Sequence, residues 1–154
     1  MEGEELMAKL LVVDDEPAIR LLLQAILAQE GHEVETAADG FEALAAVEKD
    51  LPDVVLLDLA MPNMDGWHFL EELRNKGMRS RVRVIIVSAT SDAESMARSQ
   101  VEGVNERIAK PFDATAIVRA VEGVLQEPAE DFLARREHPE DLARLIDKLQ
   151  SLDN

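Results

Sequence analysis

Short apolar runs alternate along this chain with segments of helical periodicity. Three runs are unbroken, at residues 10–13, 54–57 and 84–87. Continuous rather than alternating hydrophobicity is typical of strands covered on both faces, as in a parallel sheet. The predicted strands are residues 9–13, 33–36, 53–57, 83–87 and a less apolar 107–109. In the second strand Val34 and Thr36 alternate with acids, which indicates an edge position.

Helical periodicity fills the gaps between the predicted strands. The expected buried stripes consist of Ile19, Leu22, Leu23, Ile26 and Leu27; Leu44 and Val47; Phe69, Leu70 and Leu73; and Ile117, Val121, Val124 and Leu125. The segment 92–101 has only Met96 and Val101 as large apolar residues, so we expect a loosely packed helix there. Strict alternation of strands and helices predicts an α/β fold with a doubly wound parallel sheet.

The length of 154 residues fits one domain with a short appendage. We place the domain at residues 1–126 and a helical C-terminal extension at 127–154, with no separate output domain. The extension carries an apolar seam at Leu142, Leu145, Ile146, Leu149 and Leu152. This seam either folds back on the domain or packs against a partner or a second copy, and the extension could also be a linker in a longer chain.

Composition narrows the functional classes. The net charge of -16 disfavours direct binding to nucleic acid and favours a basic partner or a divalent cation. There is no cysteine, the N-terminus is acidic, and no apolar run is long enough for a membrane span, so we expect a cytoplasmic protein. The three histidines are scattered along the chain, and we expect them at the surface rather than in a metal site.

Polar residues directly follow four of the five predicted strands. They are Asp14 and Asp15, then Asp58, then Ser88, then Lys110. Because parallel strands end at one edge of the sheet, these side chains should converge there. Each has an ordinary explanation when taken alone: a helix cap, a turn or a solvated lysine. Together they are harder to explain structurally, since clustered carboxylates repel one another unless a cation lies among them.

The residue types indicate phosphoryl chemistry. Oxygen ligands without histidine or cysteine suit a hard cation, and a few carboxylates plus waters suit Mg²⁺ better than Ca²⁺. Lys110 and Ser88 could bind phosphoryl oxygens, which leaves Asp58 as the nucleophile. Metal and lysine would together offset the charge on the transferred group.

Four motifs make the chain similar to the response regulator receiver family. They are LVVDDEP at 11–17, LLDLAMPNMDG at 56–66, IVSA at 86–89 and KPF at 110–112. The resemblance covers about residues 8–126, and as a set the motifs are highly specific. It implies a flavodoxin-like sheet of strand order 2-1-3-4-5 and a single-domain, chemotaxis-regulator-like protein of a two-component system.

The resemblance also implies the role of each site residue. Asp58 would accept a phosphoryl group from a histidine kinase or phosphotransfer protein. Asp15 and Asp58 would bind Mg²⁺ directly, Asp14 through water, and the Ala60 carbonyl would complete the protein ligands. Ser88 and Lys110 would bind the phosphoryl group. Output would pass through a downstream protein target, and a homodimer through the C-terminal or last receiver helices is possible.

The chain departs from the family at Arg107, where members commonly have a Tyr or Phe that turns inward on activation. This arginine either extends outward in both states or pairs with an acid in one of them. Ala60 and Thr90, at positions that influence hydrolytic water in the family, carry no carboxylate or amide, which implies slow loss of phosphate and no turnover enzyme. The Lys110–Pro111 peptide is implied to be cis, and Gly66 to shape the loop after Asp58.

Two other functions are compatible with these residues. An acyl-phosphate phosphatase of similar architecture also uses an aspartate nucleophile, although such enzymes commonly carry a second acid where this chain has Ala60. A pseudo-receiver that acts only as a scaffold is the third possibility, and the presence of the complete set of site residues argues against it.

Overall fold

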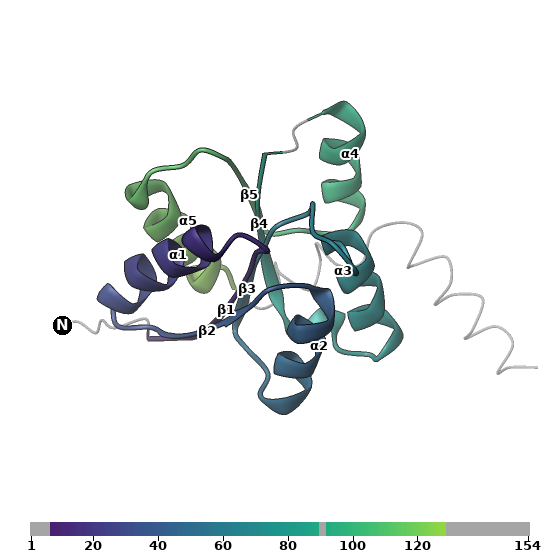
Figure 1. Ribbon diagram of the computed structural model, residues 1–154, viewed down its shortest axis with the longest axis horizontal. Coiled ribbons are helices and arrows are strands. Elements are labelled where there is room, and N and C mark those ends of the chain that lie inside the picture. The colour runs from purple at the N-terminus through teal and green to yellow at the C-terminus, as the bar shows by residue number, and fades with distance from the viewer. Residues whose placement is uncertain (1–6, 90–91, 129–154) are drawn as a thin grey trace, which may run out of the picture.

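The computed structural model describes residues 7–89 and 92–128. Its centre is a five-stranded sheet of order β2-β1-β3-β4-β5 in which all neighbours are parallel (Figure 1). The predicted fold class and strand order are therefore confirmed. The strands are β1 (Lys9–Val13), β2 (Glu33–Ala37), β3 (Val54–Leu57), β4 (Arg83–Ser88) and β5 (Glu106–Ala109).

Helices cover both faces of the sheet. On one face lie α1 (Pro17–Gln29) and α5 (Ala114–Gln126) (Figure 1). On the other lie α2 (Gly40–Lys49), α3 (Gly66–Asn75) and α4 (Ala93–Val101), with a short 3-10 turn, η1 (Arg79–Arg81), leading into β4. This two-sided cover explains why the central strands are continuously apolar.

Alternate side chains of the central strands enter two separate apolar cores. Leu11 and Val13 pack with residues of α2 and α3. Leu10 and Val12 pack with residues of α1 and α5. The period of two along a strand thus divides one apolar run between two helical layers.

The edge strand β2 is different. Its Glu33, Glu35 and Thr36 are exposed, while Val34 is half-buried and Ala37 is buried. Among the strands of residues 7–89 and 92–128, only β1 pairs with it, which confirms the edge position that the alternating pattern predicted.

The sequence placed the strand ends within one residue of those observed, but it misjudged two side chains. Leu22 is 46% exposed, whereas its neighbour Leu23 is buried. His32, expected at the surface, is 9% exposed, and its Nδ1 accepts the Ala8 amide at 3.1 Å. Burial lowers the pKa of His32. The proposed C-terminal seam and His138 lie outside the described residues.

Backbone hydrogen bonds hold the chain in register just past the strand ends. The Asp58 amide donates to the Val13 carbonyl at 2.9 Å, and the Asp14 amide donates to the Ala37 carbonyl at 3.1 Å. The first residues after β1 and β3 are therefore fixed beside each other. Within the described part of the chain, no helix is long and apolar enough to cross a membrane.

Gly66 fits tightly under the loop that follows β3. Its amide donates to the Leu59 carbonyl at 3.0 Å, and a Cβ at this position would lie 2.6 Å from the Asp58 carbonyl oxygen. Gly123 in α5 faces open space, since a Cβ added there would meet no atom within 4 Å.

We therefore expect Gly66→Ala to lower the free energy of unfolding by about 1–3 kcal/mol, because the loop must shift to admit the methyl group. Gly123→Ala is the matched control and should raise it by about 0.5–1 kcal/mol through helix propensity. Chemical denaturation of both variants measures the difference. Equal effects would show that Gly66 is not packed as described.

Candidate functional site

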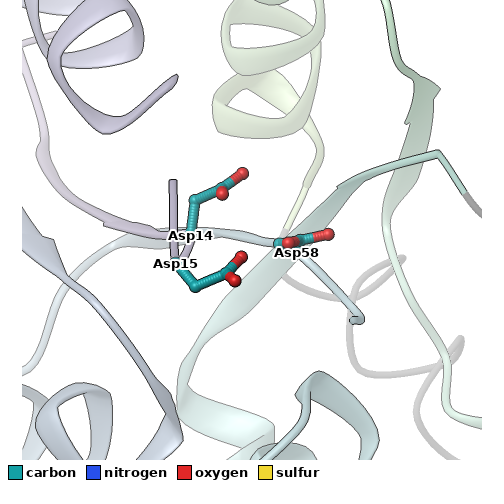
Figure 2. A group of neighbouring side chains, drawn as sticks. All are labelled: Asp14, Asp15 and Asp58. Carbon is teal, nitrogen blue, oxygen red and sulfur yellow. The ribbon is translucent and has the colours of Figure 1, made fainter. Parts of the chain in front are cut away.

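Three carboxylates meet at the edge of the sheet where β1 and β3 end. Asp14, Asp15 and Asp58 each offer one oxygen, and these oxygens all lie within 4.8 Å of one another (Figure 2). Asp14 and Asp58 are buried. The register of β1 with β3 pairs Val13 with Leu57, so the residues that follow these strands are neighbours.

None of the three acids caps a helix. The cap position of α1 is Glu16, which makes no side-chain cap hydrogen bond, and the Glu16 amide instead donates to Asp14 Oδ1 at 2.9 Å. The capping explanation for Asp15 is therefore wrong. Side-chain caps elsewhere come from other aspartates, at Asp39, Asp65, Asp92 and Asp113.

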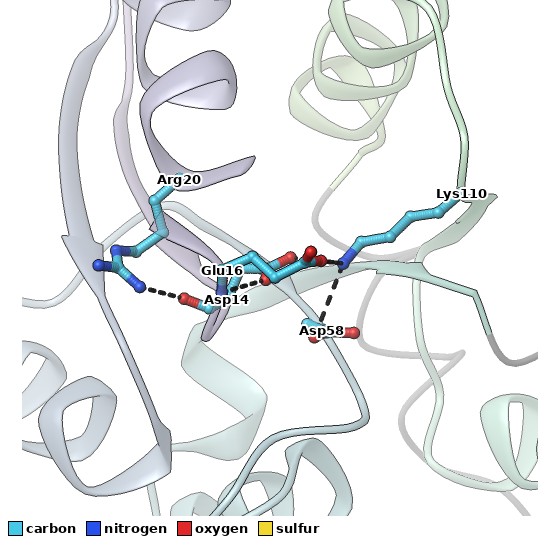
Figure 3. Close-up of polar contacts among 5 residues, drawn as sticks. All are labelled: Asp14, Glu16, Arg20, Asp58 and Lys110. Carbon is cyan, nitrogen blue, oxygen red and sulfur yellow. Dashed lines mark hydrogen bonds and ion pairs between the residues drawn. The ribbon is translucent and has the colours of Figure 1, made fainter. Parts of the chain in front are cut away.

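Lys110 brings a positive charge to the acids from the end of the edge strand β5. It follows β5, and its peptide bond to Pro111 is cis, as expected. Its Nζ lies 2.7 Å from Asp14 Oδ2, 3.6 Å from Glu16 Oε1 and 3.7 Å from Asp58 Oδ2 (Figure 3). Burial alone would lower the pKa of this ammonium, but the hydrogen bond to Asp14 and the charge of Asp58 raise it overall.

Asp58 has an unusual electrostatic environment. Burial is the main cause that raises its pKa from 3.8 to about 6, and the negative charge of Asp14 adds to the effect. Lys110 and the backbone of Ala60 oppose it. In the absence of a further cation, keeping this carboxylate ionised therefore costs free energy.

An open cleft of about 280 Å³ lies over the acids. Its walls include the predicted site residues Asp15, Asp58, Ala60, Ser88 and Lys110. Ser88 is the last residue of β4 and is buried, while Ala60 is exposed. The structure thus brings every predicted chemical residue except Arg107 to one place.

The donor set fits a hard divalent cation. The three clustered carboxylates and that of Glu16 face a single lysine among the described residues of the cleft, so negative charge remains uncompensated. No histidine or thiol ligand is among them, which suits Mg²⁺.

Two residues beside the acids had no role in the sequence reasoning, although Glu16 was recognised as one of the residues that follow the first strand. Arg20 on α1 donates from Nη1 to the Asp14 carbonyl at 2.7 Å (Figure 3). Glu16 lies close to Lys110. Their positions in the first turns after Asp14 are the only sequence signal, because nothing in a helix pattern shows which way an arginine bends.

One of our two alternatives was that Arg107 extends outward. In this structure it does not. The side chain is half-buried, its Nη1 donates to Ser99 Oγ at 2.6 Å, and its Nη2 donates to Ser95 Oγ at 2.9 Å. Both serines lie on α4. Arg107 therefore contacts a helix rather than the cleft.

A family model and curated relatives both match most of this chain. Residues 10–122 match the family described as response regulator receiver domain. The sporulation initiation phosphotransferase F of Bacillus subtilis is 40% identical over 76% of this chain and 93% of its own length. Protein PilH of Pseudomonas aeruginosa is 31% identical over 77% of this chain and 98% of its own length.

Solved structures agree with these relatives. The chemotaxis protein CheY4 of Vibrio cholerae superposes with a TM-score of 0.72 at 33% identity, over 77% of this chain and 98% of its own. Some relatives are longer: the chain spans only 48% of the probable transcriptional regulator ycf27 of Porphyridium aerugineum, to which it is 37% identical.

The raised pKa of Asp58 leads to a stability prediction for the metal-free protein. The native state binds the Asp58 proton more tightly than the unfolded chain does, so ionisation destabilises the fold as the pH rises through about 6. In EDTA at pH 7.5, Asp58→Asn should therefore be more stable than the natural chain by on the order of 2 kcal/mol. This advantage should shrink as the pH falls from 6 towards 4, and Mg²⁺ should reduce it at neutral pH.

Denaturant unfolding across this pH range measures the effect. Asp113→Asn is the matched control, because asparagine replaces aspartate well at a helix cap and should change stability little at any pH. An Asp58→Asn variant that is less stable than the natural chain in EDTA would contradict the strained carboxylate.

Proposed function

Because the chain belongs to the response regulator receiver family of two-component signal transduction, we propose that it accepts a phosphoryl group on Asp58 from a histidine kinase or a phosphotransfer protein. The observation that best supports this role is the position of Lys110 Nζ, 2.7 Å from Asp14 and 3.7 Å from Asp58. An ammonium there can meet a phosphoryl oxygen at the nucleophile.

In the proposed step, an Asp58 carboxylate oxygen attacks phosphorus of a phosphohistidine. The new P–O bond forms as the P–N bond breaks, and the leaving imidazole nitrogen keeps the electron pair and takes up a proton. Asp58 must be ionised to attack. Its pKa of about 6 allows this at neutral pH, and a bound cation would favour the ionised form further.

Asp14, Asp15, Asp58 and the Ala60 carbonyl would hold Mg²⁺, with Asp14 acting through water. The ion would supply positive charge that offsets the phosphoryl oxygens. Ser88 and Lys110 would bind two of those oxygens from β4 and from the end of β5. Ala60 lacks a group that could orient a hydrolytic water, so the acyl phosphate should be lost slowly rather than turned over.

The donor protein would dock along α1. This helix starts directly after the acids, and its Leu21 and Leu22 are 68% and 46% exposed. Large apolar side chains on the solvent face of a helix beside a reactive site suit contact with a partner helix. Output would pass to a downstream protein, without direct nucleic-acid contact by the described domain.

Acetyl phosphate with Mg²⁺ tests the acceptor role directly. We expect about one phosphoryl group per chain by intact mass, none in EDTA and none in Asp58→Asn. Many acetyl phosphate molecules consumed per chain would support a phosphatase instead, and absence of label would support a scaffold. Rapid spontaneous loss of the label would contradict the proposed slow hydrolysis.

The docking surface leads to a separate prediction. With the histidine kinase that phosphorylates this chain fastest in a panel, the double variant Leu21→Ala, Leu22→Ala should receive phosphate roughly tenfold more slowly. Its labelling by acetyl phosphate should be unchanged, because that donor needs no docking surface. Phe41→Ala on α2, where the ring is 58% exposed, is the matched control. Equal slowing with both donors would indicate damage to the site rather than lost docking.

A further inference from the structure

The loop between β3 and α3, residues 58–65, carries part of the candidate site. It begins at Asp58 and includes Ala60, which lines the acidic cleft. Burial raises the pKa of Asp58, and the backbone of Ala60 is among the groups that oppose this effect. The methyl side chain of Ala60 is exposed and cannot anchor that backbone. The position of the Ala60 peptide group therefore depends on how the rest of the loop is held.

A strained turn lies three residues further along this loop. Among the described residues, Asn63 is the only one other than glycine with a positive φ, at 70°. The Met64 amide donates to the Pro62 carbonyl at 2.8 Å, which closes a three-residue turn centred on Asn63. Such turns with a positive central φ are rare and cost free energy, so they persist only where neighbouring contacts hold them.

The contacts that hold the turn come from the start of α2. Asn63 Nδ2 donates to Asp39 Oδ2 at 3.1 Å, and the Gly40 amide donates to the Met64 carbonyl at 3.2 Å. Met64 is buried, and a Cβ on Gly40 would lie 2.5 Å from its side chain. The turn is thus packed and hydrogen-bonded against a helix whose residues do not line the described acidic cleft.

The two oxygens of the Asp39 carboxylate have different partners. Oδ1 accepts the Glu42 amide at 2.9 Å and caps α2, while Oδ2 accepts the hydrogen bond from Asn63. These bonds, above all the one from Glu42, hold the pKa of Asp39 below its usual range, so the carboxylate is ionised at neutral pH. An ionised acceptor makes a stronger hydrogen bond than a neutral one.

We propose that Asp39 and Asn63 are positioning residues for the metal site. Their hydrogen bond, here called the Asp39–Asn63 clip, holds the strained turn and thereby keeps the Ala60 carbonyl in place to bind Mg²⁺. The role of that carbonyl rests on the proposed function. A loop that already has its bound conformation loses less entropy on binding, so the clip raises the affinity for the ion. Without the clip the turn relaxes and that affinity falls.

Three substitutions separate the clip from charge and from the helix cap. Asp39→Ser keeps an oxygen that can cap α2 but lacks the second oxygen that Asn63 binds. Asp39→Asn also caps, and its amide can donate to Asn63 once the Asn63 side-chain amide turns over. Both remove the same negative charge, so only the clip distinguishes them. Asn63→Gly removes the clip while tolerating the positive φ.

Hydrogen exchange of the Gly66 amide measures how firmly the loop is held in the metal-free chain. This amide donates to the Leu59 carbonyl at 3.0 Å and so closes the loop, and none of the substitutions changes its sequence neighbours. Exchange should be roughly fivefold faster in Asp39→Ser and in Asn63→Gly, the effect of one lost hydrogen bond, and unchanged in Asp39→Asn. The double variant Asp39→Ser, Asn63→Gly should be no faster than either single variant, because both remove the same bond.

Titration with Mg²⁺, followed by amide NMR shifts at neutral pH, measures the consequence for the metal site. The dissociation constant for Mg²⁺ should rise about three- to fivefold in Asp39→Ser and in Asn63→Gly. It should stay near the natural value in Asp39→Asn. Asp113→Ser, which changes the cap of α5 in the same way, is the matched control and should leave both measurements unchanged.

The outcomes separate the clip from its consequence. Natural Gly66 exchange in both Asp39→Ser and Asn63→Gly would overturn the clip. Faster exchange with an unchanged affinity for Mg²⁺ would overturn the positioning of the Ala60 carbonyl. Equal loss of affinity in Asp39→Asn and Asp39→Ser would assign the effect to charge and also overturn the proposal. If the natural chain bound no Mg²⁺, the metal site of the proposed function would fail, but the metal-free exchange rates would still decide whether the clip holds the loop.

Discussion

Electrostatic repulsion among three carboxylates is the constraint around which this molecule is organised. The parallel register of β1 and β3 places Asp14, Asp15 and Asp58 with oxygens within 4.8 Å of one another. The ammonium of Lys110, which follows the edge strand β5, offsets part of that charge. Burial raises the pKa of Asp58, the remaining negative charge raises it further, and the two together create a demand for a cation. A rigid apolar sheet can hold such an unfavourable group in place because its two cores supply the necessary stability.

The aspartates of this chain show how position decides the role of a side chain. Four of them precede helices and accept hydrogen bonds from backbone amides: Asp39, Asp65, Asp92 and Asp113. Asp14 and Asp58 follow strands and are buried against each other's charge. Composition alone cannot distinguish the two groups, but the preceding apolar run does, because a strand end delivers its next residue to the edge of the sheet.

This rule explains what could be predicted from sequence and what could not. Continuous apolar runs located the strands, and the residues after them located the cleft. Leu22 and His32 were misjudged, and the serine partners of Arg107 were not foreseen, because these environments depend on contacts that are distant in sequence. The helical period does not show which apolar residue lies at the boundary of the buried face, and here Leu23 is buried while Leu22 is exposed. The bond of Arg107 to Ser95 and Ser99 depends on how α4 lies over β5, and no periodicity in the sequence encodes that placement.

The acidic edge strand affects how copies of this chain can meet. An open strand edge normally invites a second strand to pair with it, which leads to continuous sheets and fibres. On β2, the exposed Glu33 and Glu35 would face the same charges of another copy. Association through that edge is therefore electrostatically opposed at neutral pH. Salt that screens these charges would lower the barrier and leave the sheet open to growth from that side.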